Sequence, residues 1–378
     1  MINAVIVTNI PAPYSLDLFN SIQNNCKEIE LSIVFSAMSR KNRAWTIDLK
    51  KIKNIYSLDS IIITKKADEY IRYIHIPKNT WKTLNKINPE VLLVYEYSIT
   101  SIITLIWAKI RKRKYVHVTE GTLWSEHGIG KMQKLLRKIV INNSDFFVAC
   151  SSKSKEKLMA WGAKEEKIKT ILLTSDTKKF VLCRGKHKKR EIKYILYVGS
   201  IEYGKGVDLI VRALKYTDNK MKLIIVGSGK TEYIDKIKHL AKNEGVLDKI
   251  EFVGFLEGDD LIKEYRKSDI FVFPTRSDCY GLVLVEAYCS GLPIVSSKYA
   301  DGAYDIVENN VNGLIIDPYN AQEFGTAICE VISEKKYSLN AEKMDIEKFE
   351  IRHEAKEFEN VILEMAKIRG GVKNEFRK

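Results

Sequence analysis

Residues 274–297 read PTRSDCYGLVLVEAYCSGLPIVSS. The apolar run 269–275 leads into a polar loop at 276–280, and LVLVEAYCSG is then apolar at helical spacing. Because the apolar pattern stops at Gly291, we expect a helix that starts near Gly281 and ends there. LPIVSS after it predicts another buried strand.

Two carboxylates frame the expected helix start, Asp278 before it and Glu286 more than a turn after it. The free N–H groups at a helix N-terminus bind phosphate, and carboxylates accept hydrogen bonds from sugar hydroxyls. The spacing therefore favours a diphosphate at the helix start, with a ribose at one end and a hexose at the other. The alternative is an ordinary N-terminal cap with one glutamate on an amphipathic helix, although an unpaired charge inside an apolar helix is costly.

The same alternation extends over the chain in two sets. Strand candidates are 3–10, 30–36, 90–96, 114–120 and 145–151 in the first set, and 194–200, 222–228, 249–255, 269–275, 292–297 and 312–318 in the second. Helical patterns in the first set are 15–25, 98–112, 131–143 and 152–161. Strands rich in Val and Ile that alternate with helices predict parallel sheets buried on both faces.

A chain of 378 residues exceeds the usual size of a single core, so we expect two domains. Both are predicted to be doubly wound, Rossmann-like α/β domains, with ligands bound in a cleft at the carboxyl ends of the strands. The predicted limits are an N-terminal domain at 1–175, a charged linker at 176–193, a C-terminal domain at 194–350, and a helix with a basic tail at 351–378 that packs back toward the N-terminal domain. The last helical pattern covers roughly 339–369.

Composition places the chain among ordinary globular proteins, with 45% hydrophobic and 29% charged residues. The N-terminus lacks the pattern of a signal peptide, and the longest apolar run, 99–110, is too short to span a bilayer. The six cysteines show no CxxC or Cys/His spacing, which argues for reduced thiols and against a structural zinc. We therefore expect a cytoplasmic protein.

The net charge of +14 is unevenly distributed. Residues 1–180 hold 30 Lys and Arg against 16 Asp and Glu, whereas residues 181–378 hold 32 of each. Such an excess attracts a negative partner. KIRKRK at 109–114 and GKMQKLLRKIVI at 130–141 are basic, and basic amphipathic helices lie on anionic membranes. For any one segment, a solvated helix face is the alternative. We expect peripheral contact with the inner face of the cell membrane.

Two further strand-to-loop-to-helix units point to the same edge of the second sheet. YVGSIEYGKG places Lys205 just after a buried strand, and LIIVGSG places Gly227 after the next one. Lys205 is positioned to meet the same diphosphate, or else is a surface lysine in a turn. The chain has no GxGxxG and no Walker motif.

The second half resembles the donor-binding domain of the retaining GT-B glycosyltransferases of family four, the glycosyl transferases group 1. The matching runs are YVGSIEYGKGVDLIVRAL, LIIVGSG, the stretch from IEFVGF to LPIVSS, and DIVENNVNGLIIDP, in the family's order. By that resemblance Asp278 holds donor-sugar hydroxyls, Glu286 the ribose and Lys205 a phosphate. The donor-binding set that it implies is Ser200, Lys205, Gly227, Phe255, Leu256, Asp278, Tyr280, Gly281, Leu282, Val283 and Glu286, with Phe255 and Leu256 along the base.

The chain departs from the family's pattern at several positions. The first acid of the paired acidic motif is the shorter Asp278, and Ser200 replaces an arginine that often precedes the lysine. In the first half, Glu120 stands where the family has a histidine, to orient an acceptor hydroxyl or to brace the loop. The acceptor-side loop is predicted to contain Pro11, Pro13, Tyr14, Glu120 and Gly121, and the catalytic set to be Asp278, Glu286, Lys205 and Glu120.

The resemblance implies transfer with retention of anomeric configuration, in which the leaving phosphate helps to deprotonate the acceptor. No Asp-x-Asp motif is present, which agrees with stabilisation of the diphosphate by Lys205 and a helix dipole, so we expect no metal and no cofactor. The expected partners are a nucleotide-sugar donor, a lipid-linked or oligosaccharide acceptor and an anionic membrane. The role would be surface polysaccharide or glycoconjugate assembly.

Two other functions remain open. A GT-B-type nucleotide-sugar epimerase shares the architecture, but it would turn over donor without an acceptor and has no need of a basic acceptor domain. A basic nucleic-acid-binding protein would carry basic residues interleaved with aromatics in a recognisable module, and none is found. We therefore expect no nucleic-acid partner.

Overall fold

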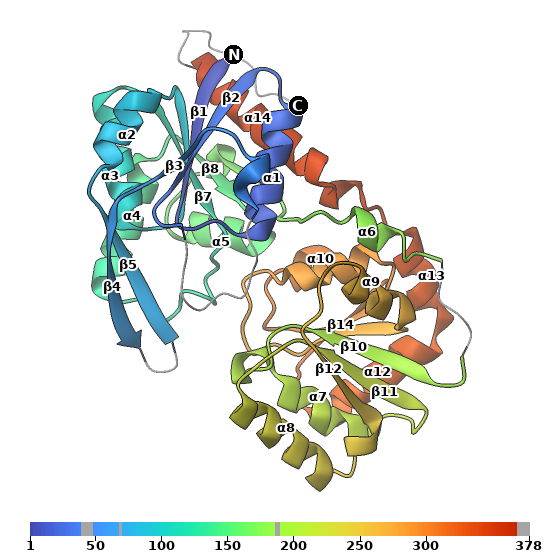
Figure 1. Ribbon diagram of the computed structural model, residues 1–378. Helices are drawn as coiled ribbons and strands as arrows, with labels where there is room; N and C mark the ends of the chain where they lie inside the picture. The colour runs from blue at the N-terminus through green and yellow to red at the C-terminus, as the bar shows by residue number, and fades with distance from the viewer. Residues whose placement is uncertain (39–47, 68–69, 186–189, 369–378) are drawn as a thin grey trace. The chain divides into compact units, whose positions relative to one another are not determined.

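The computed structural model describes residues 1–38, 48–67, 70–185 and 190–368. The chain divides into two compact units. Both can be followed in Figure 1, where the colour runs along the sequence. Unit 1 is Met1–Ser175 together with the segment from Ile351, and unit 2 is Asp176–Glu350. Each unit is described by itself.

Unit 1 is built on a parallel sheet in the order β3-β2-β1-β6-β7-β8-β9. Its central strands are buried runs of Val, Ile and Leu, as expected of a sheet covered on both faces. The strands are β1 (Ile2–Thr8), β2 (Ile29–Phe35), β3 (Ile55–Ser57), β6 (Val91–Tyr95), β7 (Lys114–Thr119), β8 (Phe146–Ala149) and β9 (Ile168–Thr170). The order of strands reverses between β1 and β6, the point at which such sheets bind ligands.

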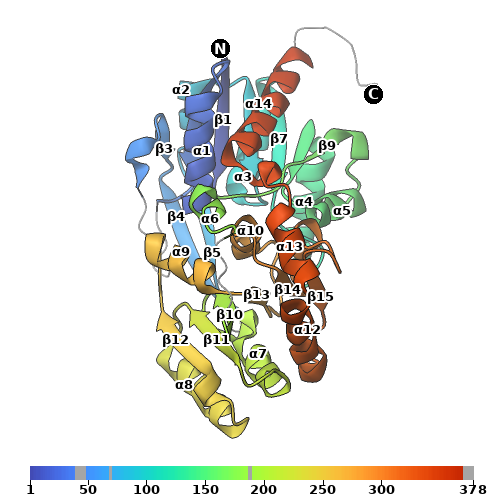
Figure 2. The same cartoon turned by 90° about the vertical axis from the view of Figure 1, so that its right-hand side faces the viewer.

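The helices of unit 1 cover both faces of this sheet. They are α1 (Pro13–Asn25), α2 (Thr80–Ile87), α3 (Ile99–Ile110), α4 (Lys131–Asn143), α5 (Ser152–Ala160) and α14 (Ile351–Lys367). Residues of α2, α3 and α4 share one hydrophobic core that includes Leu84, Trp107 and Val140. α14 returns at the end of the chain to lie beside α1, as Figures 1 and 2 show.

Unit 2 repeats the design with the parallel order β12-β11-β10-β13-β14-β15. Its strands are β10 (Lys193–Val198), β11 (Met221–Val226), β12 (Ile250–Gly254), β13 (Ile270–Phe273), β14 (Ile294–Ser297) and β15 (Gly313–Ile316). The order reverses between β10 and β13. The predicted class, two doubly wound α/β domains, is confirmed.

Helices lie on both faces of the second sheet, α9 and α10 on one and α7, α8 and α12 on the other (Figure 1). The helices are α6 (Lys178–Val181), α7 (Val207–Ala213), α8 (Thr231–Asn243), α9 (Gly258–Lys267), α10 (Leu282–Cys289), α11 (Ala303–Ile306), α12 (Ala321–Ser333) and α13 (Lys335–Lys343). Single 3-10 turns complete the two units: η1 (Leu49–Lys51), η2 (Glu165–Lys167), η3 (Tyr203–Lys205), η4 (Leu214–Tyr216), η5 (Leu247–Lys249) and η6 (Glu347–Phe349).

Three features differ from the sequence-based expectation. The described part of the expected linker 176–193 lies within unit 2, and its α6 packs against α9 and α10. The helical pattern 339–369 is interrupted, because α13 ends at Lys343 and α14 begins only at Ile351. An antiparallel hairpin, β4 (Ser60–Ala67) and β5 (Tyr70–Pro77), was not predicted.

Candidate functional site

Backbone hydrogen bonds join the carboxyl ends of β10, β11 and β12 in unit 2. The Gly199 N–H donates to the Val226 carbonyl at 3.0 Å, and the Gly227 N–H donates to the Gly254 carbonyl at 2.8 Å. At Gly227, where φ is +149°, an added Cβ would lie 1.8 Å from the Gly199 carbonyl oxygen. Glycine is therefore required at 227, and this predicted donor-site residue shapes the edge through its backbone.

Lys205 and Asp278 meet at this edge. The Lys205 Nζ donates to Asp278 Oδ2 at 2.7 Å, and the two side chains are 28% and 14% exposed. Burial alone lowers the pKa of Lys205, but the charge and hydrogen bond of Asp278 outweigh it and hold that pKa above its ordinary value. The predicted phosphate-binding lysine and the predicted sugar-binding acid therefore lie in direct contact, with Lys205 charged.

The start of α10 is fixed by Gly281. Its φ is +81°, and an added Cβ would lie 2.8 Å from Cε1 of the buried Phe273 ring. The helix begins at Leu282, as predicted, and the Leu284 N–H donates to the Gly281 carbonyl at 2.8 Å. The backbone N–H groups of the first turn, including those of Leu282 and Val283, are the ones that a helix leaves for capping groups or ligands.

Glu286 lies one turn further along α10 and is partly exposed. Its Oε2 accepts a hydrogen bond from the hydroxyl of Tyr265 at 2.8 Å, a partner on α9 that the sequence did not indicate. Burial raises the pKa of Glu286 to about 7, against the opposing effect of the Tyr265 hydrogen bond. With a pKa near 7, the Glu286 side chain is therefore partly protonated and partly ionised at neutral pH. Its other carboxyl oxygen is left to accept a hydrogen bond from a hydroxyl group of a ligand.

Arg276 is a residue of this edge that sequence reasoning missed, although it lies in the opening stretch two positions before Asp278. Its guanidinium forms two hydrogen bonds with Asp208 of α7, at 2.8 and 2.7 Å, and its centre lies 3.8 Å from the ring centroid of Tyr203. The backbone N–H of Arg276 also donates to the Gly204 carbonyl at 2.9 Å. Arg276 thereby ties the loop of Asp278 to the loop of Lys205.

The remaining predicted donor-site residues lie around the same strand ends. Ser200 is exposed after β10 and donates to Glu202 at 2.9 Å. Phe255 is 55% exposed after β12, and Leu256 beside it is partly exposed. Tyr280 differs, because the whole residue is only 3% exposed and its backbone N–H already donates to Asp278 Oδ1 at 3.1 Å, so this predicted donor-site residue offers almost no surface to a ligand.

Unit 1 places a second polar group at the carboxyl ends of its own strands. Glu120 follows β7, and both of its carboxylate oxygens lie 3.3 Å from the hydroxyl of Tyr14 on α1. Its backbone N–H donates to Glu96, which follows β6, at 3.0 Å. Burial and the charge of Glu96 raise the pKa of Glu120 to about 7, although the Tyr14 hydrogen bond opposes them.

The other predicted acceptor-side residues of unit 1 are Pro11, Pro13 and Gly121. Pro11 is buried and Pro13 begins α1, where its missing N–H costs nothing. At Gly121 an added Cβ would lie 2.6 Å from Glu126, whose carboxylate pairs with Lys157 at 3.3 Å. Gly121 is thus held against this ion pair.

Glu354 is a further carboxyl group of unit 1 that sequence reasoning missed. It belongs to α14, is 2% exposed, and its Oε2 has no hydrogen-bond partner among the described residues. Burial and the charge of Glu120 raise its pKa well above the ordinary value. No sequence signal identifies it, because α14 reaches this place only through folding.

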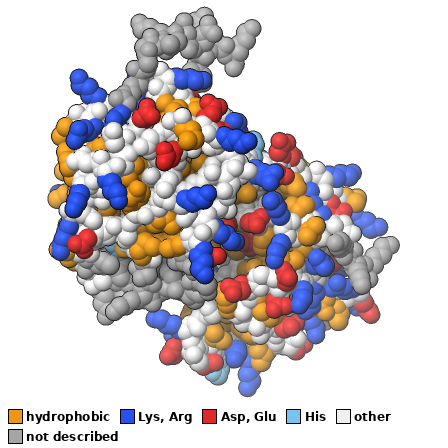
Figure 3. All heavy atoms as spheres, turned by 45° about the horizontal axis from the view of Figure 1, so that its top comes forward, with side chains coloured by type: hydrophobic (Ala, Val, Ile, Leu, Met, Phe, Trp, Pro, Cys, Tyr) orange, Lys and Arg blue, Asp and Glu red, His pale blue; other side chains and the backbone are white. Residues whose placement is uncertain are grey.

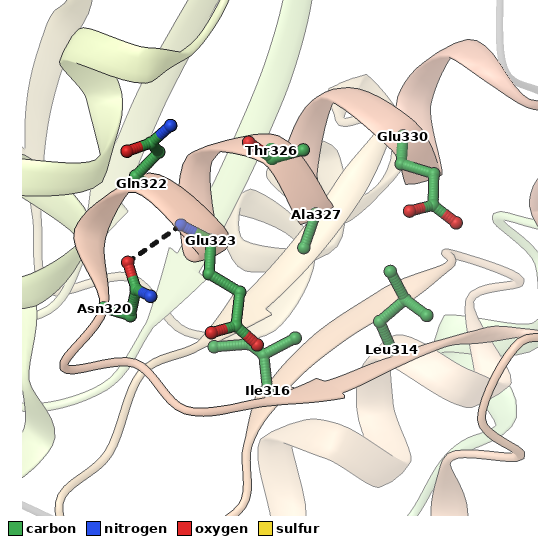
Figure 4. Close-up of a pocket in the computed structure, with 8 residues that line it drawn as sticks. All are labelled: Leu314, Ile316, Asn320, Gln322, Glu323, Thr326, Ala327 and Glu330. Atoms are coloured by element: carbon green, nitrogen blue, oxygen red, sulfur yellow. Dashed lines mark hydrogen bonds between the residues drawn. The ribbon is translucent and has the colours of Figure 1, made fainter.

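A cavity of about 480 Å³ lies elsewhere in unit 2, between β15 and α12 (Figure 4). Its lining is Leu314, Ile316, Asn320, Gln322, Glu323, Thr326, Ala327 and Glu330. None of the predicted site residues lines it. In the described parts of the chain, no three His, Cys, Asp or Glu side chains are arranged to hold a metal ion.

Comparison with known proteins finds a family similarity in the second half of the chain. Residues 183–347 match the family model described as Glycosyl transferases group 1. An uncharacterized glycosyltransferase of Methanocaldococcus jannaschii is 34% identical over 45% of this chain and 44% of its own length. An uncharacterized glycosyltransferase of Haemophilus influenzae is 27% identical over 71% of this chain and 73% of its own.

The fold extends beyond the sequence match. The crystal structure of Anabaena HepE in complex with UDP and glucose superposes with a TM-score of 0.73, over 96% of this chain and 100% of that one, at 15% identity. At that identity the likeness shows the fold. Residues 183–347 of this chain are therefore similar to the glycosyl transferases group 1 family, and the chain as a whole adopts the GT-B fold.

Proposed function

We propose that the protein transfers a sugar from a nucleotide-sugar donor to a lipid-linked or glycan acceptor, with retention of anomeric configuration and without a metal. The observation that carries the proposal is the meeting of Lys205, Asp278 and the start of α10 at the switch point of unit 2. A cation, a hydroxyl acceptor and a helix N-terminus at one strand edge suit a diphosphate that bears a sugar.

The diphosphate binds at the first turn of α10, where Lys205 supplies a positive charge. Transfer breaks the bond between the anomeric carbon and the phosphate oxygen, so negative charge grows on the leaving nucleoside diphosphate. Lys205 and the helix dipole are in place to stabilise that charge, and the proposal of a metal-independent reaction rests on them.

The carboxylates on either side recognise the two sugars. Asp278 accepts hydrogen bonds from the transferred sugar, and Glu286 from the ribose. Phe255, exposed after β12, offers an apolar face to the base. The bound UDP and glucose of the Anabaena relative of the same fold support this ligand class for the present chain.

The acceptor binds in unit 1 in this proposal. Glu120 accepts a hydrogen bond from the attacking hydroxyl, and Tyr14 holds the Glu120 carboxylate in place. The leaving phosphate takes the acceptor's proton, so the new glycosidic bond forms on the face from which the diphosphate departs. The product would enter a surface polysaccharide or another glycoconjugate.

Donor binding is the first test. Calorimetric titration with a panel of nucleoside diphosphates and nucleotide-sugars, with and without EDTA, should yield one tight ligand whose affinity EDTA does not change. Lys205→Ala should weaken that affinity roughly 10- to 100-fold, because a charge-assisted hydrogen bond is worth about 1.5–3 kcal/mol. Lys236→Ala, an exposed lysine on α8, is the matched control and should bind normally.

Measurements of turnover distinguish a glycosyltransferase from a nucleotide-sugar epimerase. With the donor that binds, sugar should be consumed only when an acceptor is present, and NMR of the product should show the anomeric configuration of the donor. Epimerised donor in the absence of acceptor would replace the transferase with an epimerase. If no nucleotide bound at all, the start of α10 would be an ordinary capped helix end.

A further inference from the structure

α4 turns apolar side chains toward solvent. Met132, Leu135 and Ile139 are 69%, 52% and 37% exposed, whereas Arg137 and Val140 face the interior at 7% and 0%. Residues spaced by three and four positions share one face of a helix, so the three apolar side chains form a continuous strip. An amphipathic helix of a soluble domain normally buries such a strip, and this one leaves it uncovered.

A row of lysines borders the strip. Lys131, Lys134 and Lys138 are all exposed, and their spacing places them together along one flank of Met132, Leu135 and Ile139. α4 contains no Asp or Glu. On the face drawn in Figure 3, basic, acidic and hydrophobic side chains are intermixed. On α4, by contrast, the exposed basic and apolar side chains follow each other in two adjacent rows, without an acidic residue between them.

The loop that enters α4 adds two large apolar side chains. Leu123 and Trp124 are 49% and 44% exposed. The loop is anchored from behind, because Glu126 accepts a hydrogen bond at 2.7 Å from Arg137 on the buried side of α4. We call these exposed residues the apolar–basic face: Leu123, Trp124, Lys131, Met132, Lys134, Leu135, Lys138 and Ile139.

We propose that the apolar–basic face docks on an anionic lipid bilayer. The apolar strip and Trp124 enter the boundary between headgroups and acyl chains, and the lysines remain against the anionic headgroups. Basic amphipathic helices with an aromatic residue lie in that boundary, and tryptophan prefers it. The described residues contain no helix long and apolar enough to cross a bilayer, so the contact proposed is peripheral.

The charge and polarity of the apolar–basic face favour a lipid bilayer over a nucleic acid or a second copy of the chain as its partner. A nucleic acid would pair with the lysines but would gain nothing from Met132, Leu135 and Ile139. A second copy of the same face would bring the three lysines against three others. The membrane proposal and the proposed function have only the lipid-linked acceptor in common. Binding to vesicles requires neither a bound donor nor turnover.

The test is sedimentation of the full chain with vesicles of phosphatidylcholine, alone or mixed with phosphatidylglycerol. Binding should require phosphatidylglycerol and weaken with salt. Each lysine near an anionic surface strengthens binding roughly fivefold. The double variant Lys134→Gln/Lys138→Gln should therefore bind the anionic vesicles roughly 30-fold more weakly than the parent. The matched control, Lys236→Gln/Lys242→Gln on α8, makes the same change of charge and should bind as the parent does.

The apolar half of the face has its own readouts. Leu135→Gln should weaken binding by roughly tenfold or more, since the transfer of a leucine side chain from water is lost. Insertion should shift the tryptophan emission to shorter wavelength, and Trp124→Phe should remove most of that shift. The free energy of unfolding of each variant, from denaturant melts, should match the parent because these side chains are exposed in the free protein.

Three results would overturn the proposal. The first is equal binding to neutral and anionic vesicles, the second is an equal loss in the α8 control, and the third is a dimer in solution that Leu135→Gln dissociates. Donor affinity measured without vesicles reports on the proposed function alone. A protein that binds donor but not vesicles would therefore contradict only the membrane proposal.

Discussion

Glu120 holds its proton more tightly in the folded chain than in the unfolded chain, because burial and Glu96 raise its pKa from 4.5 to about 7. Between those values the folded state binds more protons than the unfolded state, so the free energy of unfolding falls as pH rises through this window. We expect Glu120→Gln, which cannot ionise, to be more stable than the parent above pH 7, by about 2–3 kcal/mol. The advantage should shrink toward zero as pH falls to 4.5.

Thermal melts of both proteins across that range measure the difference. Glu166→Gln, an exposed glutamate of the same unit, is the control and should show no such trend. The same Glu120→Gln protein should bind donor normally and transfer sugar more slowly, because its amide is a weaker acceptor for the attacking hydroxyl. A variant that loses stability at high pH would show that Glu120 is ionised and well solvated in the fold.

The position of a site residue could be predicted where the local sequence alone determines it. Lys205 and Asp278 each follow a buried strand, and parallel strands bring such positions to one edge. The Arg276–Asp208 pair and the Tyr265–Glu286 hydrogen bond join helices or loops distant in sequence, so no spacing indicates them. Tyr280 was placed on the donor side by its neighbours, but packing turned its ring inward.

Among the elements, α10 depends on a single glycine at its start. Gly281→Ala combines a left-handed backbone, at φ +81°, with a Cβ 2.8 Å from the Phe273 ring. We expect it to lower the free energy of unfolding by about 2–3 kcal/mol and to weaken donor binding, because the first turn of α10 must move. Chemical denaturation and calorimetric titration measure the two effects.

Gly245→Ala is a matched control for the element-scale prediction. Gly245 also has a left-handed backbone, at φ +70°, but an added Cβ meets nothing within 4 Å. It should cost only about 1–2 kcal/mol and leave donor affinity unchanged. If Gly281→Ala bound donor as tightly as Gly245→Ala does, the start of α10 would not be part of the donor site.

Elements with strong local patterns were predicted to within a few residues, and those set by tertiary context were not. α4 was expected at 131–143 and is observed at Lys131–Asn143. Its orientation was not predictable, since the helix offers apolar residues on two sides and only packing against the sheet decides that Val140 is buried and Leu135 exposed. The β4–β5 hairpin was missed because its strands combine apolar with basic residues.

At the scale of the whole molecule, the last helix of the described chain does not belong to the unit that precedes it in sequence. α14 follows unit 2 in sequence but belongs to unit 1, where its Ala355 carbonyl accepts a hydrogen bond from the thiol of Cys26, the residue that follows α1. The same return brings Glu354 into the electrostatic environment of Glu120. The last helix therefore belongs to the unit that carries the proposed acceptor side, and unit 1 is complete only when the chain has been made through α14.

A reciprocal pair of core substitutions tests this division. Phe358 of α14 and Phe324 of α12 are each 1% exposed, in unit 1 and unit 2 respectively. Each change to Ala should cost about 3–5 kcal/mol. In hydrogen exchange, Phe358→Ala should speed exchange in α1 and β1 and leave donor affinity intact. Phe324→Ala should speed exchange in α7 and weaken donor binding. Equal loss of protection in both units from either change would mean that the chain unfolds as one cooperative body.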